Sequence, residues 1–167
     1  ARSRSVSFPM TNDRLLHETQ SALTRHWALT PLDGKKPIRS NWSKEPALEL
    51  PELLAHVRAG HNIGLRTGST SHVAVLDFDD ASTLEAAEAK LGFKLPPTPV
   101  ARTGSGKLHV YLQAPEGLRN SASRIAPHVD VRGDGGQVVL PGSIHPDTGE
   151  PYTWLVTPDE APLAPWP

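Results

Sequence analysis

Apolar residues recur with a helical period in the first half of the chain. They return every three or four residues over 12–26. A shorter segment, 51–60, has proline at its start and glycine after its last helical position, the usual arrangement at helix ends. A third segment, 81–91, is rich in Ala, Glu and Lys, which are strong helix formers. We expect one helix in each segment, the first capped by Thr11 or Asn12.

Short apolar runs bounded by Gly, Pro, Asn and Ser predict strands in the rest of the chain. The expected strands are 27–32, 62–67, 72–79, 100–103, 107–113, 129–132, 137–140 and 152–156. Residues 68–71 form the expected turn between the second and third of these. Helices and strands mix in the first half, and the second half is mostly strand. This order favours a mixed α/β or α+β fold over a doubly wound parallel sheet.

The composition fits one globular domain. Apolar residues make up 37% of 167 residues, and only proline, with 17 copies, is in clear excess. We expect residues 1–11 to be a flexible lead-in, residues 12–157 to form the domain, and the proline-rich residues 158–167 to be a linker towards further domains. The absence of cysteine excludes a disulfide scaffold, a thiol nucleophile and a Cys-ligated zinc site. It also fits a reducing, cytosolic setting.

The net charge of −1 argues against a nucleic-acid-binding protein, which usually carries a basic excess. The total, however, hides an asymmetry along the chain. Residues 1–60 carry +3 and residues 101–145 carry +2, whereas 61–100 carry −2 and 146–167 carry −4. A basic cluster, Lys35, Lys36 and Arg39 near Trp42, could hold template phosphates or be a solvated loop. No apolar run reaches the length of a membrane span, and no secretory signal is visible.

Carboxylates follow the continuously apolar run 73–76. Such a run is typical of a strand that is buried on both faces. Because side chains alternate along a strand, Asp77 and Asp79 should point the same way. Paired carboxylates suit Mg²⁺ or Mn²⁺, which polymerases and nucleases use in pairs. The alternative is a strand end followed by a helix, and Asp80 then fits an N-cap.

A glycine-containing loop opens the strand 107–113. Gly104 and Gly106 allow the backbone to approach a ligand and to present N–H groups to an anion. Lys107, His109 and Tyr111 alternate with apolar residues and therefore share one face of the strand. A cation and an imidazole beside such a loop suit a phosphate. The alternative is a plain hairpin turn, and the spacing is not that of a Walker A motif.

Two further polar segments lie in the second half. In 129–132, Asp130 and Arg132 share one face, so Asp130 could be a third metal ligand and Arg132 could stabilise a triphosphate. The alternative is an Asp–Arg surface pair before a turn. In 141–146, a rigid turn presents a hydroxyl and the imidazole of His145. Together with the two segments described above, these residues suit metal-assisted phosphoryl transfer on a nucleotide.

The order of these motifs resembles the bifunctional primase–polymerase (Prim-Pol) domain of the archaeo-eukaryotic primase superfamily, found in phage and plasmid replication proteins. The matching stretches are WALTP with GKKP at 27–37, NIGLRTG at 62–68, VLDFD at 75–79, RTGSG with His109 at 102–109, and VDVRGDGG through SIHP at 129–146. The resemblance spans about residues 13–156. It implies a catalytic core with an RRM-like sheet beside a smaller α/β subdomain, the two forming a cleft.

The resemblance also implies roles for individual residues. Asp77, Asp79 and Asp130 would hold two divalent ions, Mg²⁺ or Mn²⁺, and no zinc is expected because the chain lacks cysteine. His109, with Ser105 and Gly106, would grip the triphosphate of the incoming nucleotide. Arg132 and His145 would contact the same nucleotide. Lys107 stands where the family usually has a second glycine, so it adds a phosphate contact or points outward.

These residues lead to a hypothesis of template-directed nucleotidyl transfer, which is DNA primase or DNA polymerase activity. The implied partners are nucleoside triphosphates, a single-stranded DNA template with its primer, and a helicase that is fused to the domain or works with it. No membrane partner is implied. The implied setting is the cytoplasm of a bacterial or archaeal cell that carries a phage, plasmid or prophage. The alternatives are a metal-dependent nuclease or nucleotide hydrolase, and a non-catalytic nucleotide- or single-strand-binding module.

Overall fold

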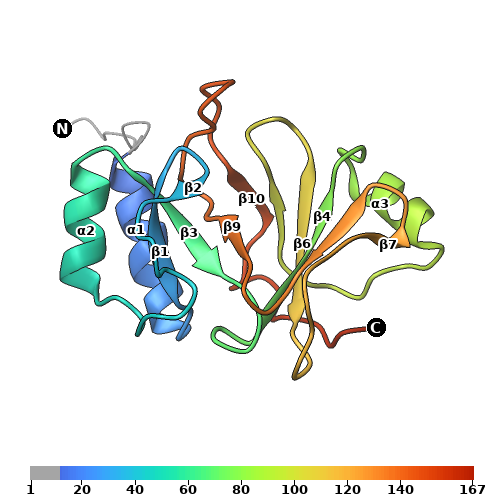
Figure 1. Cartoon of the computed structure of the whole chain (residues 1–167). Helices are drawn as coiled ribbons and strands as arrows, with labels where there is room; N and C mark the ends of the chain where they lie inside the picture. Colours follow the sequence, from blue (N-terminus) through green and yellow to red (C-terminus); the bar gives the residue numbers. More distant parts are fainter. Residues whose placement is uncertain (1–11) are drawn as a thin grey trace.

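The computed structural model describes residues 12–167, which form three helices and two antiparallel sheets (Figure 1). The helices are α1 (Asn12–Thr24), α2 (Leu50–Arg58) and α3 (Leu84–Leu91), close to the predicted segments. The α+β prediction is therefore confirmed. The predicted lead-in and the Thr11 cap lie outside the described residues. No helix in residues 12–167 is both long and apolar enough to cross a membrane.

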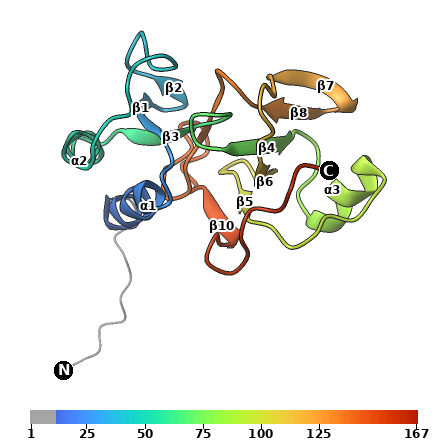
Figure 2. The ribbon, with the colours of Figure 1, turned by 90° about the horizontal axis from the view of Figure 1, so that it is seen from below.

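The strands divide into a four-stranded and a six-stranded sheet. The first sheet has the order β2-β1-β3-β9, with β1 (Leu29–Asp33), β2 (Lys36–Pro37), β3 (Asn62–Arg66) and β9 (Gln137–Val139). The second has the order β10-β5-β6-β4-β8-β7, with β4 (Val73–Phe78), β5 (Val100–Arg102), β6 (Leu108–Gln113), β7 (Ser121–Ala126), β8 (Val129–Arg132) and β10 (Thr153–Val156). Helices α1 and α2 lie beside the first sheet, and α3 lies beside the second (Figures 1 and 2).

The structure corrects the start of α3. The sequence predicts a helix from Ala81, and the alternative interpretation of the carboxylates made Asp80 its N-cap. The helix instead begins at Leu84, and Thr83 is its N-cap. The Thr83 hydroxyl oxygen accepts a hydrogen bond from the N–H of Ala86 at 3.1 Å, which satisfies one of the free donors of the first turn. The carboxylate of Asp80 instead lies 3.0 Å from the ammonium of Lys90, so the N-cap prediction for Asp80 is wrong.

Strands β2 and β7 were not predicted, because neither has a pattern of apolar residues. Strand β2 has two residues, and four of the six residues of β7 are exposed. The turn at 68–71 also differs from a simple hairpin. It joins β3 to β4, which belong to different sheets, and only a bridge between Gly68 and Val73 remains of the expected pairing.

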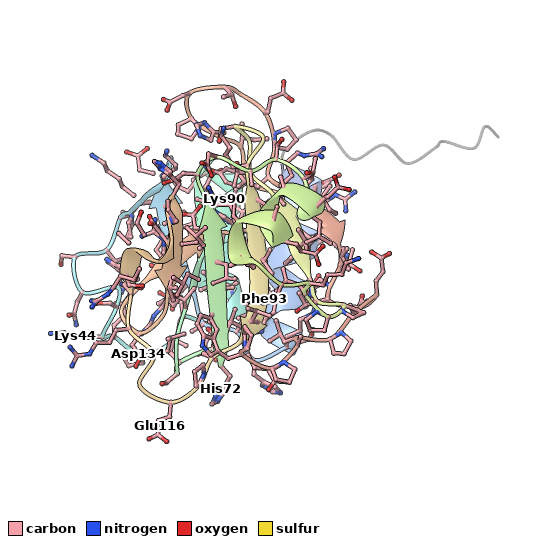
Figure 3. The ribbon with its side chains drawn as sticks, turned by 90° about the vertical axis from the view of Figure 1, so that its right-hand side faces the viewer. Lys44, His72, Lys90, Phe93, Glu116 and Asp134 are labelled. Atoms are coloured by element: carbon pink, nitrogen blue, oxygen red, sulfur yellow. The ribbon has the colours of Figure 1, made fainter. Side chains whose placement is uncertain are left out.

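Strand β4 lies between two hydrophobic cores, as its continuously apolar sequence predicts. Val73 and Val75 belong to a core that includes residues of α1, α2 and β3 and therefore joins the two sheets. Leu76 and Phe78 belong to a second core on the other face, which α3 covers. Figure 3 shows α3 in front of these strands, with Phe93 just beyond its last residue. Asp77 lies on the same face as Val75, at the point where the first core ends.

Residues 158–167 pack against the second sheet. The N–H of Gln113 donates to the carbonyl of Ala164 at 2.8 Å, and the N–H of Ala164 donates to the hydroxyl of Thr98 at 3.0 Å. Trp166 adds to the core beneath α3. The tail is thus part of the packed structure of this domain, and the expectation that it leads to further domains stays a prediction.

Candidate active site

A polar pocket of about 390 Å³ lies between the two sheets. Its volume is within the range of small-molecule sites, about 300–1,000 Å³. Asp77, Lys107, His109 and Arg132 line it from the second sheet and its turns, and Lys35, Gln137 and His145 line it from the opposite side. Asp79, Ser105 and Tyr152 complete its polar wall. The structure therefore brings most of the sequence-predicted site residues into one pocket.

Asp77 is at the centre of the polar contacts. The sheet register places it opposite His109 of β6 on one side and opposite Asp130 of β8 on the other. Its carboxylate lies 3.3 Å from Nε2 of His109 and 3.2 Å from Nη2 of Arg132. Burial raises the pKa of Asp77, but hydrogen bonds and charge from His109 and Arg132 outweigh burial and lower that pKa to about 2. Asp77 is therefore an anion at neutral pH.

Asp79 and Asp130 lie near Asp77 but in different surroundings. Burial raises the pKa of Asp79, and the neighbouring charges of Asp77 and Asp130 raise it further. The carboxylate of Asp130 accepts a hydrogen bond from the N–H of Ser123 at 3.2 Å and lies 3.7 Å from the Arg132 guanidinium. Asp77 and Asp79 line the pocket as predicted, whereas Asp130 is not among the lining residues. Asp130 is nevertheless opposite Asp77 in the β4–β8 register, and both carboxylates contact Arg132.

The donor set at this place suits a hard divalent cation. Three carboxylates at the ends of adjacent strands supply oxygen ligands, which Mg²⁺ and Mn²⁺ prefer. Their mutual repulsion at Asp79 is what a bound cation would relieve. Within residues 12–167, no three His, Asp or Glu side chains are already arranged around one metal position. Instead, the Arg132 guanidinium lies between Asp77 and Asp130.

The β5–β6 turn forms one side of the pocket. The N–H of Gly106 donates to the carbonyl of Thr103 at 2.9 Å, and the N–H of Lys107 donates to the Thr103 hydroxyl at 3.0 Å. Gly106 adopts φ +87°, a conformation that glycine takes without strain. Its N–H is thus used inside the turn, which differs from the expected free donor. Ser105 and Lys107 remain as the polar side chains that the turn presents to the pocket.

His145 approaches the same turn because position 104 is glycine. A Cβ at Gly104 would collide with the Cβ of His145 and would lie 2.6 Å from the carbonyl oxygen of Glu150. Nδ1 of His145 accepts hydrogen bonds from the N–H groups of Asp147 and Thr148 at 3.1 and 3.3 Å. A neutral imidazole that accepts at Nδ1 carries its proton on Nε2. His145 is therefore held as an Nε2–H donor in the pocket wall.

Tyr152 supports the imidazole of His145. The two rings stack with centroids 5.8 Å apart and an interplanar angle of 18°. Burial raises the pKa of Tyr152 to about 12, with smaller effects from the charges of Asp77 and Asp147, so its hydroxyl stays protonated. No pattern in the sequence marks Tyr152 as a site residue, because it lies in an ordinary Pro-Tyr-Thr segment.

Tyr111 and Lys35 differ from the sequence-based expectation. Tyr111 shares a strand with His109, yet it is fully buried between Trp27 and Trp154, outside the pocket. The sequence places Lys35 in a basic cluster with Lys36 and Arg39 that could hold template phosphates or be a solvated loop, and in the structure Lys35 lines the pocket. Which residues of a polar strand face reach a pocket depends on what covers the strand, and the sequence pattern does not carry this information.

Comparison with protein families agrees with this geometry. A family model described as the N-terminal domain of bifunctional DNA primase/polymerase (Prim-Pol) matches residues 19–167. The match includes all ten strands of the described structure and every residue that lines the pocket. No curated protein matched the chain. The extent of the family match shows that this chain belongs to the Prim-Pol family of bifunctional DNA primase/polymerase N-terminal domains, which are nucleotidyltransferases.

Proposed function

We propose that this domain carries out template-directed nucleotidyl transfer in the pocket between its two sheets. The observation that carries the proposal is the division of charge inside the pocket. Carboxylates of Asp77 and Asp79 lie in the same pocket as the cations of Lys107 and Arg132. A nucleoside triphosphate needs such a division, because its phosphates bind cations while the reacting oxygens need metal-binding carboxylates.

The carboxylates are the proposed metal ligands. Prim-Pol enzymes typically use divalent metals, and Asp77, Asp79 and Asp130 would hold them here. When bound, a pair of Mg²⁺ or Mn²⁺ ions supplies a polarised 3′-hydroxyl and neutralises charge on the phosphates. The ionised state of Asp77 at neutral pH keeps its oxygens ready to act as ligands. His109 contacts Oδ1 of that carboxylate and Arg132 contacts Oδ2, so both oxygens are held in place.

The remaining side chains grip the nucleotide in this proposal. Ser105 and Lys107 donate hydrogen bonds to phosphate oxygens, with Gly106 giving their turn its shape. His145 donates from Nε2, and Arg132 adds a guanidinium that offsets charge developing on the phosphates. His109 contacts the nucleotide while its Nε2 stays near Asp77. Ser105, Lys107, His145 and Arg132 are donors, which matches a ligand whose phosphates consist of acceptors.

The wider setting follows from the family and stays a proposal. In this view the six-stranded sheet is the RRM-like catalytic sheet, and the four-stranded sheet with α1 and α2 is the smaller α/β subdomain across the cleft. The substrates are nucleoside triphosphates and a primed single-stranded DNA template. We further propose a helicase partner, fused or separate, and a role in phage, plasmid or prophage replication in the cytoplasm of the host cell.

A primer-extension assay with labelled nucleotides and Mn²⁺ tests the proposal. Wild type should lengthen a primer on a single-stranded template. Asp77→Ala and Asp79→Ala should each reduce extension by about 100-fold or more, because each removes a ligand of the metal ions that would stabilise charge in the transition state. Glu116→Ala is the matched control, because Glu116 is an exposed acid in a loop at the far edge of the molecule (Figure 3). Equal traces from all four proteins would contradict the proposal.

Product analysis separates the other candidate activities. A nuclease would shorten the labelled strand, and a nucleotide hydrolase would release phosphate without using the template. A non-catalytic binding module would bind nucleotide, as calorimetry would show, but would give no product with either metal. Only longer, template-matched strands support the proposed reaction.

A further inference from the structure

The turn between β1 and β2 is fixed over the pocket by three separate parts of the chain. The side-chain amide of Asn62 donates to the carbonyl of Gly34 at 2.9 Å, and that of Gln137 donates to the carbonyl of Lys35 at 3.1 Å. Gly34 has φ +64°, and a Cβ there would lie 3.3 Å from the ring of Pro146. A two-residue turn held in this way has a defined position, so its side chains are presented in a defined direction.

Gly64 explains how Gln137 reaches the turn. Gln137 pairs with Arg66, at the far end of β3 from Asn62, and its side chain crosses the position where residue 64 has no side chain. A Cβ at Gly64 would collide with the amide oxygen of Gln137. The first sheet is therefore built to let β9 hold the β1–β2 turn.

Lys35 is a free cation in the pocket. It lines the same cavity as Lys107 and Asp77, and no carboxylate in residues 12–167 forms an ion pair with it. Arg39, two residues beyond the short strand β2, is by contrast paired with Glu45 at 2.6 Å. An unpaired ammonium in a polar pocket attracts an anionic ligand.

We propose that Lys35 binds the phosphate tail of the incoming nucleoside triphosphate from the side opposite Lys107. This inference rests on the function proposed above. The phosphate tail would then lie between a cation from the first sheet and a cation from the second, so that binding links the two sheets. Lys35 and Lys36 are both exposed residues of the same hairpin, but only Lys35 is among the residues that line the pocket. The pair Lys35 and Lys36 thus separates a contact inside the pocket from general surface charge.

Binding measurements on the 167-residue protein test the proposal. Fluorescently labelled nucleoside triphosphate and monophosphate are titrated into wild type, Lys35→Ala and Lys36→Ala, with Mn²⁺ and separately with a chelator. Because hydrogen bonds between charged groups are stronger than those between neutral groups, Lys35→Ala should weaken triphosphate binding roughly 10- to 100-fold. Monophosphate binding should change less than about threefold, and Lys36→Ala should bind both ligands as wild type does. Lys35→Arg should recover most of the lost affinity.

A second measurement tests the affinity change by an independent method. A ligand that binds only the folded state raises its melting temperature in proportion to the logarithm of its concentration over Kd. At one triphosphate concentration, Lys35→Ala should therefore show a smaller rise than wild type and Lys36→Ala. The three proteins should melt alike without nucleotide, because Lys35 makes no ion pair within the described residues.

The outcomes distinguish this inference from the function on which it rests. If wild type binds triphosphate and Lys35→Ala binds it equally well, the role of Lys35 is refuted and the proposed function stands. If Lys35→Ala and Lys36→Ala weaken binding of single-stranded DNA alike and leave nucleotide binding intact, the turn is a template contact and the inference is also refuted. If wild type binds no triphosphate under any condition, both proposals fail.

Discussion

Asp77 and Asp79 offer the sharpest test of the structure, because their substitution should affect stability differently. Asp77→Asn removes a carboxylate whose charge is stabilised by His109 and Arg132. Asp79→Asn removes a carboxylate whose charge is disfavoured by burial and by Asp77 and Asp130. Both variants should lose primer extension. Only Asp77→Asn should destabilise the fold at neutral pH, while Asp79→Asn should leave stability unchanged or raise it.

The magnitude follows from the pKa of Asp77. Its value of about 2 in the folded protein compares with 3.8 for the unperturbed group, and each pKa unit corresponds to about 1.4 kcal/mol. Ionised Asp77 therefore contributes about 2 kcal/mol to the free energy of unfolding. Because the folded pKa is lowered, this contribution is fully present above pH 3.8 and is lost as pH falls through about 2. For Asp79 the folded pKa is raised, so the destabilising effect of its charge is present above that pKa and disappears below it.

Urea denaturation followed by tryptophan fluorescence measures both effects, since Trp27 and Trp154 pack in the core that joins the sheets. The unfolding free energies of wild type and the two variants are compared at pH 7 and at several values down to pH 3. The wild type minus Asp77→Asn difference should be about 2 kcal/mol at pH 7 and should shrink as pH falls. The other carboxylates titrate in both proteins, so their contributions to the unfolding free energy cancel when the difference is taken.

Equal destabilisation by the two substitutions would refute the reasoning. It would mean that the Arg132–Asp77–His109 contacts do not set the charge balance of the site. A difference that grows towards low pH would contradict the lowered pKa of Asp77 directly. Glu116→Gln serves as the control for removing an exposed acid, and it should match wild type throughout.

Two further predictions concern packing around the pocket. Gly104→Ala should weaken triphosphate binding about tenfold or more, since the new Cβ would displace His145. Calorimetry of nucleotide binding measures the change in affinity, and an unchanged affinity would show that His145 does not contact the nucleotide. Arg66→Lys should destabilise the protein by about 1–3 kcal/mol in urea denaturation. The buried guanidinium donates from Nη1 to the carbonyl of Glu45 and from Nη2 to that of Ser43, both at 3.0 Å, and the single nitrogen of lysine does not reproduce this two-nitrogen fork. Wild-type stability of Arg66→Lys would show that the 43–45 loop is not held by this residue.

Several features of this protein follow from local sequence alone. The continuously apolar 73–76 run predicted a strand buried on both faces, and β4 lies between two cores. The helices α1 and α2 lie where the apolar spacing places them. Alternation along a strand also placed Asp77 and Asp79 towards one pocket. These predictions succeed because side-chain periodicity is a property of the local backbone.

The interpretation of Asp80 as the N-cap of α3 was wrong because the local sequence does not single out one cap. Asp, Ser and Thr all make good N-caps, so the residues before a helix offer several starting points. The chain uses Thr83, and the nearby Lys90 pairs with Asp80 instead. Strand β7 was missed because it is mostly exposed, and so leaves no alternation of apolar and polar residues to detect.

The composition of the pocket was decided by tertiary structure. Asp77, His109, Lys35 and Tyr152 are far apart in the chain, and they meet because β4 pairs with β6 and because the first sheet lies across the pocket from the second. The sequence determined which residues carry charge and which face of a strand they share, since both depend on neighbours one or two positions away. Only the packed structure decided that Lys35 enters the pocket while Tyr111 becomes core, because burial depends on which distant segment covers a residue.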